Sequence, residues 1–248
     1  MATSLLKPVV RALAIGGGAA AGAYAVSAAL AWRRYGTVPA PHPDQHDELL
    51  DRFIPRPDVV ERHAIAVKAP PDVTLEAAKN QDLLDSATIR AIFKTREIVL
   101  GGTAADPPPP RELLASVLSL GWGVLADVPG REIVLGAVTR PWEPTVVFRS
   151  LPPGAFAAFA EPRFVKIVWT LRADPTANGT CVFRTETRAQ ATDAMARSLF
   201  RRYWAFASPG IALIRRLSLG PLKREAERRA AATMAGLKPR PTAPSLSP

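Results

Sequence analysis

The chain of 248 residues is 48% hydrophobic and carries a formal net charge of +10, which suits one globular domain with additional segments. The positive charge lies at the ends, because residues 1–34 carry four basic and no acidic side chains and residues 197–229 carry nine basic and two acidic ones. A body without excess positive charge argues against a nucleic-acid partner, whereas basic ends are typical of proteins that meet anionic membrane surfaces.

The N-terminal segment is uncharged from residue 12 to residue 32, and two arginines follow directly. As a helix this run spans about 31 Å, the thickness of a bilayer core. We therefore expect one transmembrane helix within an N-terminal anchor of residues 1–35, a single pass that leaves the soluble part in the cytoplasm. A cleaved signal peptide is the alternative. The Gly18-x-x-x-Gly22 spacing allows close approach of helices and is compatible with a homodimer.

The next segments are predicted from composition and periodicity. Residues 36–58 are rich in proline and polar side chains and are predicted to be a linker. Residues 59–67 alternate and are rich in β-formers, which predicts a first strand. Residues 69–84 and 86–100 have helical patterns, and a four-proline loop at 103–113 follows them.

The middle of the chain changes to a period of two. Residues 121–142 predict two strands joined by a Pro-Gly turn, residues 145–150 predict a third, and residues 163–190 predict two more around the turn DPTANG. From Thr192 the period is helical again, so we expect one long C-terminal helix that bends near Pro209. This order predicts an α+β fold in which helices pack on a single face of one curved antiparallel sheet. The Pro/Ser-rich residues 235–248 are predicted to be a disordered tail.

The chain then shows a family resemblance in four segments: VVERHAIAVKAPPDVTLEAA, GWGVLADVPGREIVLGAVTRPWEP, EPRFVKIVWTLRADPTANGTCVFRTETRAQATDAMARSLFRRYW and SPGIALIRR. They resemble the SRPBCC superfamily of START-like helix-grip proteins, and more narrowly its bacterial polyketide cyclase/dehydrase-like members. The resemblance implies a helix-grip domain over residues 59–234, whose curved sheet wraps the long C-terminal helix around an apolar cavity. It implies lipid, sterol, polyketide or aromatic ligands, and cyclisation or hydrolysis in some members. The superfamily shares no universal catalytic residue, so the resemblance assigns none here.

Aromatic side chains are the candidate lining of such a cavity, with plain core packing as their alternative role. The candidates are Trp122, Trp142, Phe148, Phe156, Phe159, Trp169, Phe183, Phe200, Tyr203 and Trp204. The last three share one helical stripe with Ala207, and this stripe is expected to face the sheet.

Arg184, Glu186 and Arg188 alternate along the last predicted strand and therefore share one face of it. On the concave face they would be a polar anchor for a carboxylate or phosphate. On the convex face they would be a solvated or ion-paired ladder. The sequence leaves both interpretations open.

Basic side chains beside the anchor and on the outward face of the C-terminal helix are candidates for contact with anionic lipid headgroups. These are Arg33, Arg34, Arg201, Arg202, Arg215 and Arg216.

Signals for catalysis or for a bound metal are weak. His63, the only histidine of the predicted domain, lies on a predicted strand, and a half-exposed strand residue is its simplest interpretation. The single Cys181 excludes an intramolecular disulfide and is expected to be a small core residue. His42 and His46 lack further ligands for zinc. No phosphate-binding or dinucleotide motif is present, so we expect no cofactor and no metal.

These patterns predict a membrane-anchored protein that binds a hydrophobic small molecule, lipid-like or polyketide-like, between its sheet and its C-terminal helix. One alternative is an aromatase/cyclase-type enzyme that uses the same cavity. Another is a membrane-proximal interaction module without a ligand.

Overall fold

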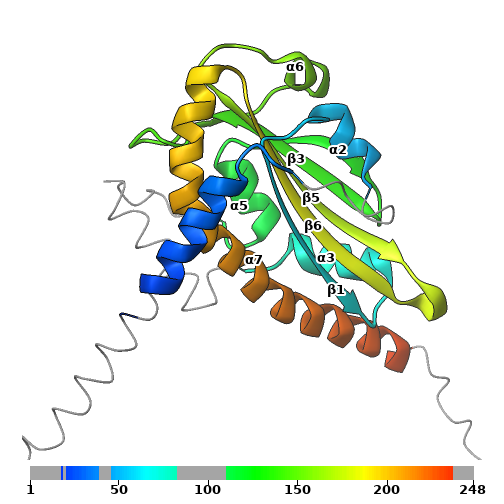
Figure 1. The fold of residues 1–248 in the computed structure, drawn as a ribbon. Coiled ribbons are helices and arrows are strands. Elements are labelled where there is room, and N and C mark those ends of the chain that lie inside the picture. The colour runs from blue at the N-terminus through cyan, green and yellow to red at the C-terminus, as the bar shows by residue number, and fades with distance from the viewer. Residues whose placement is uncertain (1–17, 19–20, 39–45, 83–109, 237–248) are drawn as a thin grey trace, which may run out of the picture.

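The computed structural model describes residues 18, 21–38, 46–82 and 110–236 (Figure 1). The predicted helix over 86–100 lies outside these residues, as does the predicted tail after Gly236. The described elements after the N-terminal helix of residues 21–34 are, in chain order, α2 (Glu48–Phe53), β1 (Val59–Val67), α3 (Pro71–Lys79), α5 (Leu113–Ser119), β2 (Gly123–Val128), β3 (Glu132–Thr139), β4 (Phe148–Arg149), α6 (Pro153–Ala158), β5 (Val165–Pro175), a 3-10 turn (Ala177–Gly179), β6 (Cys181–Ala191) and α7 (Ala194–Gly236).

The strands form one antiparallel sheet in the order β1-β6-β5-β3-β2, and the short β4 pairs with β3. The first and last long strands are therefore neighbours, which brings the start of the domain beside the strand that leads into α7. β5 and β6 contain 11 residues each and are joined by a turn in which Asn178 and Gly179 adopt positive φ. Both residue types tolerate this conformation, as the predicted DPTANG turn requires.

Strand alternation divides the sheet into two faces. Cross-strand pairs such as Trp169 with Thr187 and Val59 with Ala189 put the odd-numbered residues of β1, β5 and β6 on the face toward α7. We call this the α7 face and the other one the α2 face. The α7 face corresponds to the predicted concave face, because the sheet packs against the long C-terminal helix on that side (Figure 1).

The long helix α7 covers its face in two parts that run in different directions (Figure 1). In the first part, Phe200 and Trp204 pack on Val59, Val165 and Ala189 of the sheet. The second part places small and branched residues against α3, α5 and the strands, namely Leu219, Leu222, Ala226 and Ala230. Pro209 and Pro221 lie inside the helix, where each removes one backbone donor, and this accounts for a change of direction near the predicted bend.

The α2 face is also covered, which differs from the expected single layer of helices. Leu50 and Phe53 of α2 and Phe156 of α6 pack on Val134 and Val168 of the sheet. The expectation of a linker over 36–58 is wrong at this point, because Leu50 is fully buried there. Local chemistry explains the helix: the carboxylate of the preceding Asp47 accepts the backbone N–H of Leu50 and caps it.

The N-terminal helix of residues 21–34 lies beside the first part of α7. The Tyr24 and Phe206 rings are 6.2 Å apart, and the Tyr35 and Phe200 rings are 5.9 Å apart, both with edge-on geometry. Within the described residues no helix has the length and apolar character needed to cross a membrane. The predicted anchor also includes residues 1–17 and 19–20, which the structure does not describe, so the transmembrane helix and the glycine-mediated homodimer stay predictions.

Candidate ligand-binding site

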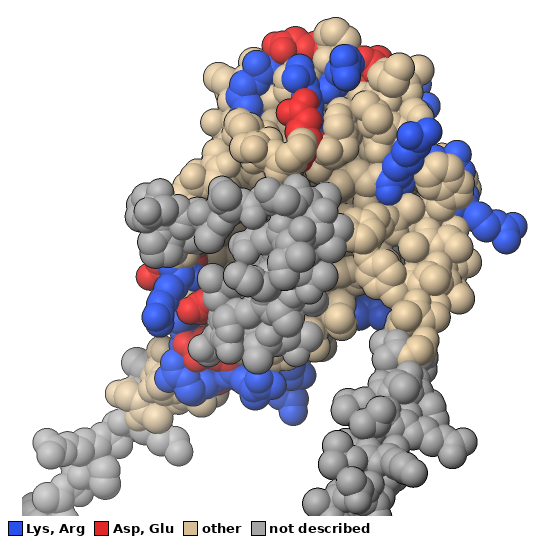
Figure 2. All heavy atoms as spheres, turned by 90° about the vertical axis from the view of Figure 1, so that its left-hand side faces the viewer, with Lys and Arg blue, Asp and Glu red and all other residues tan. Residues whose placement is uncertain are grey.

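A hollow of about 1620 Å³ surrounds the middle of α7, where the helix passes between the N-terminal helix and the sheet. Its walls come from residues 23–38, from the start of β1, from α7 between Tyr203 and Arg216, and from Leu120, Trp122 and Phe148. Figure 2 looks onto the side of the molecule where the N-terminal helix and the first part of α7 lie, and the charged groups of the described surface there surround a largely uncharged area. This volume, with walls that are mostly apolar, suits a hydrophobic guest.

The lining is mostly aliphatic and aromatic. α7 supplies Trp204, Pro209 and Ile211, and the N-terminal helix supplies Leu30 and Ala31. Pro209 and Gly210 lie at the change of helix direction, and both line the hollow. The bend therefore leaves the space open where a straight helix with larger side chains would fill it.

Four of the ten predicted cavity aromatics line the hollow, namely Trp122, Phe148, Tyr203 and Trp204. The other six lie elsewhere in the fold. Trp142, Trp169, Phe183 and Phe200 are on the α7 side but belong to the packed core. Phe156 and Phe159 are on the α2 face, so their predicted place in the cavity is wrong. Helix α6 explains the difference, because it is entered through Pro152 and Pro153 and packs against α2.

Arg215 has a different place from the predicted one. It was expected on the outward face of the helix, but its guanidinium lies over the ring of Trp169, 3.7 Å from the ring centre. Its Nη2 donates a hydrogen bond of 3.3 Å to Oγ1 of Thr187. Burial lowers the pKa of Arg215 to about 9, and the charge of Glu61 opposes part of that shift. A cation thus lies between α7 and the sheet, beside the hollow.

Further polar groups of neighbouring strands lie on the same α7 face. Nε1 of Trp169 donates a 2.7 Å hydrogen bond to Oγ1 of Thr185, which holds the indole in place. On β1, Nε2 of His63 lies 2.9 Å from Oε1 of Glu61. The His63 side chain is only 9% exposed, so this histidine is more buried than the sequence indicated. We call Glu61, His63, Trp169, Thr185, Thr187 and Arg215 the polar cluster.

Arg184, Glu186 and Arg188 lie on the α2 face, opposite the hollow, and therefore cannot be its polar anchor. Nε of Arg188 donates to Glu186 at 2.6 Å, and Nε of Arg62 donates to the same carboxylate at 2.7 Å. Arg188 also pairs with Asp51 of α2 and donates to the carbonyl of Ile54. The row is an ion-paired ladder that α2 covers, so it binds α2 to the sheet.

The remaining predicted membrane-surface arginines divide into two groups. Arg33, Arg34, Arg202 and Arg216 are exposed, and Arg34 and Arg216 also line the hollow. Arg201 instead packs against the N-terminal helix, with its guanidinium 4.2 Å from the centre of the Trp32 ring. Four of the six thus remain free to meet an anionic surface.

Tyr35 and Asp58 also line the hollow. Burial and the neighbouring Asp58 raise the pKa of the Tyr35 hydroxyl. Asp58 itself forms an ion pair of 3.0 Å with Arg197. The described residues contain no group of three or more His, Cys, Asp or Glu side chains placed to hold a metal ion.

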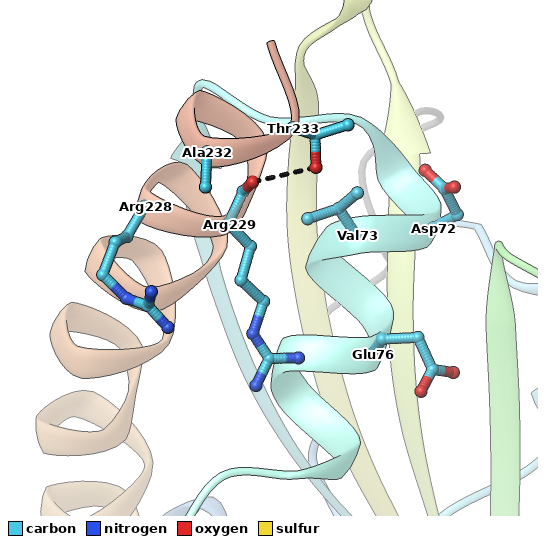
Figure 3. A pocket seen from close by; sticks show the side chains of 7 residues that line it. All are labelled: Asp72, Val73, Glu76, Arg228, Arg229, Ala232 and Thr233. Carbon is cyan, nitrogen blue, oxygen red and sulfur yellow. Dashed lines mark hydrogen bonds between the residues drawn. The ribbon is translucent and has the colours of Figure 1, made fainter. Parts of the chain in front are cut away.

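A smaller hollow of about 450 Å³ lies between α3 and the end of α7 (Figure 3). Its walls are the side chains Asp72, Val73, Glu76, Arg228, Arg229, Ala232 and Thr233. Arg228 and Arg229 both donate to Glu225, and Thr233 donates to the carbonyl of Arg229. In these contacts the charged and polar side chains of α7 bond to other groups of the same helix. This surface therefore holds no organised ligand-binding site.

Comparison with known proteins gives only distant similarities. No protein-family model matches the chain, and no curated protein sequence matches it. Protein MLL2253 from Mesorhizobium loti is 16% identical over 68% of this chain and 98% of its own, with a TM-score of 0.33. CalU16 from Micromonospora echinospora is 12% identical over 71% and 87%, with a TM-score of 0.23. The Zhui aromatase/cyclase from Streptomyces sp. R1128 is 13% identical over 71% and 97%, with a TM-score of 0.25. Conclusions about this chain therefore rest on its own geometry.

Proposed function

We propose that this protein binds a hydrophobic small molecule, lipid-like or polyketide-like, in the hollow around the middle of α7, as a member of the helix-grip ligand carriers. The observation that carries the proposal is an apolar hollow of about 1620 Å³ at the bend of the long helix. Ligand sites in proteins are commonly about 300–1,000 Å³, so the space is large enough for a long-chain or polycyclic guest. Each Å² of apolar ligand surface buried there contributes about 25 cal/mol, which is the main driving force for binding.

The proposal includes a membrane as the source of the ligand, with the soluble part on its cytoplasmic side. Support comes from the uncharged run of residues 12–32 and from exposed arginines beside the hollow, Arg34 and Arg216. Arg33 and Arg202 add exposed positive charge nearby in the sequence. Each such residue contributes about 1 kcal/mol of attraction to an anionic leaflet. A ligand that leaves the bilayer at this surface would enter the hollow directly.

The test uses the full-length chain in lipid nanodiscs, with a fluorescent long-chain fatty acid as the probe and empty nanodiscs as the blank. Ala207→Trp fills the hollow from α7 and is expected to weaken probe binding at least about tenfold. Ala231→Trp adds the same side chain at an exposed position of the same helix and is expected to leave binding unchanged. Native mass spectrometry of the wild-type protein should show a bound lipid-like molecule. The absence of both probe binding and a bound molecule, or equal binding by the two variants, would contradict the proposal.

A further inference from the structure

Arg215 is a cation without a carboxylate partner in the described structure. Among the described residues it contacts the neutral hydroxyl of Thr187 and the ring of Trp169. Glu61 acts on it through its charge, while Oε1 of Glu61 lies 2.9 Å from Nε2 of His63, and no described carboxylate is paired with Arg215. Arginines enclosed between a helix and a sheet are ordinarily paired, as Arg188 is between α2 and the other face of the same sheet.

The contacts of Arg215 satisfy only a small part of its hydrogen-bonding capacity. A guanidinium has five N–H donors in a planar fork, and Thr187 accepts one of them at 3.3 Å. The Trp169 ring supports the cation from one side without using its donors. The guanidinium nitrogens are not among the fully enclosed, unbonded polar atoms of the structure, so the free donors are accessible. The edge of the fork is therefore available to an acceptor that the described residues do not supply.

The position of the fork links it to the hollow. Ile214 and Arg216, its neighbours in α7, line the hollow, and so do Ile211 one turn earlier and Glu61 on β1. The turn of α7 that carries Arg215 and the polar-cluster residue Glu61 thus both border the apolar space. A ligand with a hydrocarbon part in the hollow would bring its polar end to this border.

We propose that Arg215 binds the carboxylate of an amphipathic ligand whose hydrocarbon part occupies the hollow. A carboxylate matches the planar fork with two parallel hydrogen bonds and neutralises a charge that is costly to bury. Thr187 and Trp169 hold the guanidinium in position for this contact. Glu61 repels a doubly charged head more strongly than a singly charged one, which favours a carboxylate over a phosphate monoester. This inference rests on the proposed function and names its ligand class.

The experiment compares a fluorescent long-chain fatty acid with its methyl ester on the full-length chain in nanodiscs. The wild-type protein is expected to bind the acid about tenfold or more tightly than the ester. Arg215→Gln should bind the two probes equally while keeping the wild-type affinity for the ester. Arg224→Gln removes an exposed charge from the same helix and should keep the wild-type preference. If Arg215→Gln keeps the preference, or loses affinity for both probes to the same extent, the assignment is wrong.

A second measurement on the wild-type protein covers the case in which Arg215→Gln does not fold. The preference for the acid should survive about 0.5 M salt, because a contact inside the protein is screened far less than contacts with exposed arginines. Loss of the preference at high salt would assign it to surface charges and overturn the inference. The failure of the proposed function is distinguishable, because wild-type protein would then bind neither the acid nor the ester.

Discussion

Arg201 packs on Trp32 and joins the first part of α7 to the N-terminal helix of residues 21–34. The guanidinium of Arg201 lies 4.2 Å from the centre of the Trp32 ring, and its Nε and Nη2 donate to the Trp32 carbonyl at 3.1 and 2.9 Å. The carbonyl belongs to the last turn of the N-terminal helix, where backbone acceptors lack partners within the helix. One side chain therefore satisfies a backbone acceptor at that helix end and packs on its aromatic residue.

Arg201→Ala is expected to loosen the N-terminal helix without unfolding the domain. Amide hydrogen exchange in residues 21–34 should become faster, because the substitution removes both hydrogen bonds and the stacking contact. The global free energy of unfolding should change by about 1 kcal/mol or less, since this contact is partly exposed. Arg202→Ala, at the exposed neighbouring position, is the matched control. Equal exchange rates in the two variants would show that Arg201 does not hold the helix.

Gly121→Ala is expected to destabilise the fold near the wall of the hollow. Gly121 has a φ of 98°, and a Cβ there would lie 2.3 Å from the carbonyl oxygen of Phe148. Strain and the backbone clash together should cost about 3 kcal/mol in chemical denaturation. Gly179→Ala is the control, because its φ is 68° and no atom lies within 4 Å of the added carbon. It should cost only about 1 kcal/mol. Similar losses in both variants would exclude the contact with Phe148 as the cause.

Arg188→Ala should be among the most destabilising substitutions on the α2 face. The Arg188 side chain is 4% exposed, and its removal leaves the buried Glu186 with Arg62 as its one described partner. Breaking such a buried network should cost about 3 kcal/mol in urea denaturation. Arg131→Ala removes a 54% exposed partner of Asp174 and should cost less than about 1 kcal/mol. A comparable loss for the two would mean that α2 does not depend on the ladder.

Glu132 should make stability depend on pH. Burial and a hydrogen bond with Asp47 raise the pKa of Glu132 from 4.5 to about 8, against the opposing effects of Thr170 and Arg172. The folded state therefore keeps this proton to about pH 8, whereas the unfolded state releases it near pH 4.5. The free energy of unfolding should fall as pH rises between these values and level off above them.

Glu132→Gln tests this dependence, because it retains a neutral side chain at every pH. The variant should lose less stability than the wild-type protein between pH 5 and pH 8 in denaturation experiments. Glu143→Gln, which replaces an exposed partner of Arg140, should follow the wild-type curve. An unchanged pH dependence in Glu132→Gln would contradict the raised pKa.

The order of the main elements follows from the sequence because periodicity is a local property. The long last helix, the paired strands before it and the DPTANG turn all lie where their patterns predict them. The sequence did not predict α2, because a helix of six residues is too short to show a helical period of apolar residues. Its Leu50 and Phe53 nevertheless share a helix face behind the cap Asp47, and this pattern was a readable signal.

The candidate site was less predictable because it depends on which residues meet across the sheet. Arg215 follows Ile211 by four residues and the buried Ser208 by seven, and it precedes Leu219 by four. By its spacing Arg215 therefore lies on the stripe of α7 that faces the sheet. It was expected on the outward face because it is charged. The strand pairing that brings Glu61 and Thr187 to opposite positions is not encoded by either strand alone. Likewise, no local pattern tells which face of the sheet α6 covers.

The Arg201–Trp32 contact also determines which form of the protein is worth assaying. A chain shortened to begin at residue 37 is the natural choice for handling in water, but it lacks Tyr24, Ala31 and Tyr35. Those residues form one wall of the hollow, and Tyr35 also packs against Phe200. A shortened chain would therefore present a groove open to water, with weaker and less selective binding. Affinities measured on the shortened chain would describe a hollow that lacks one of its walls.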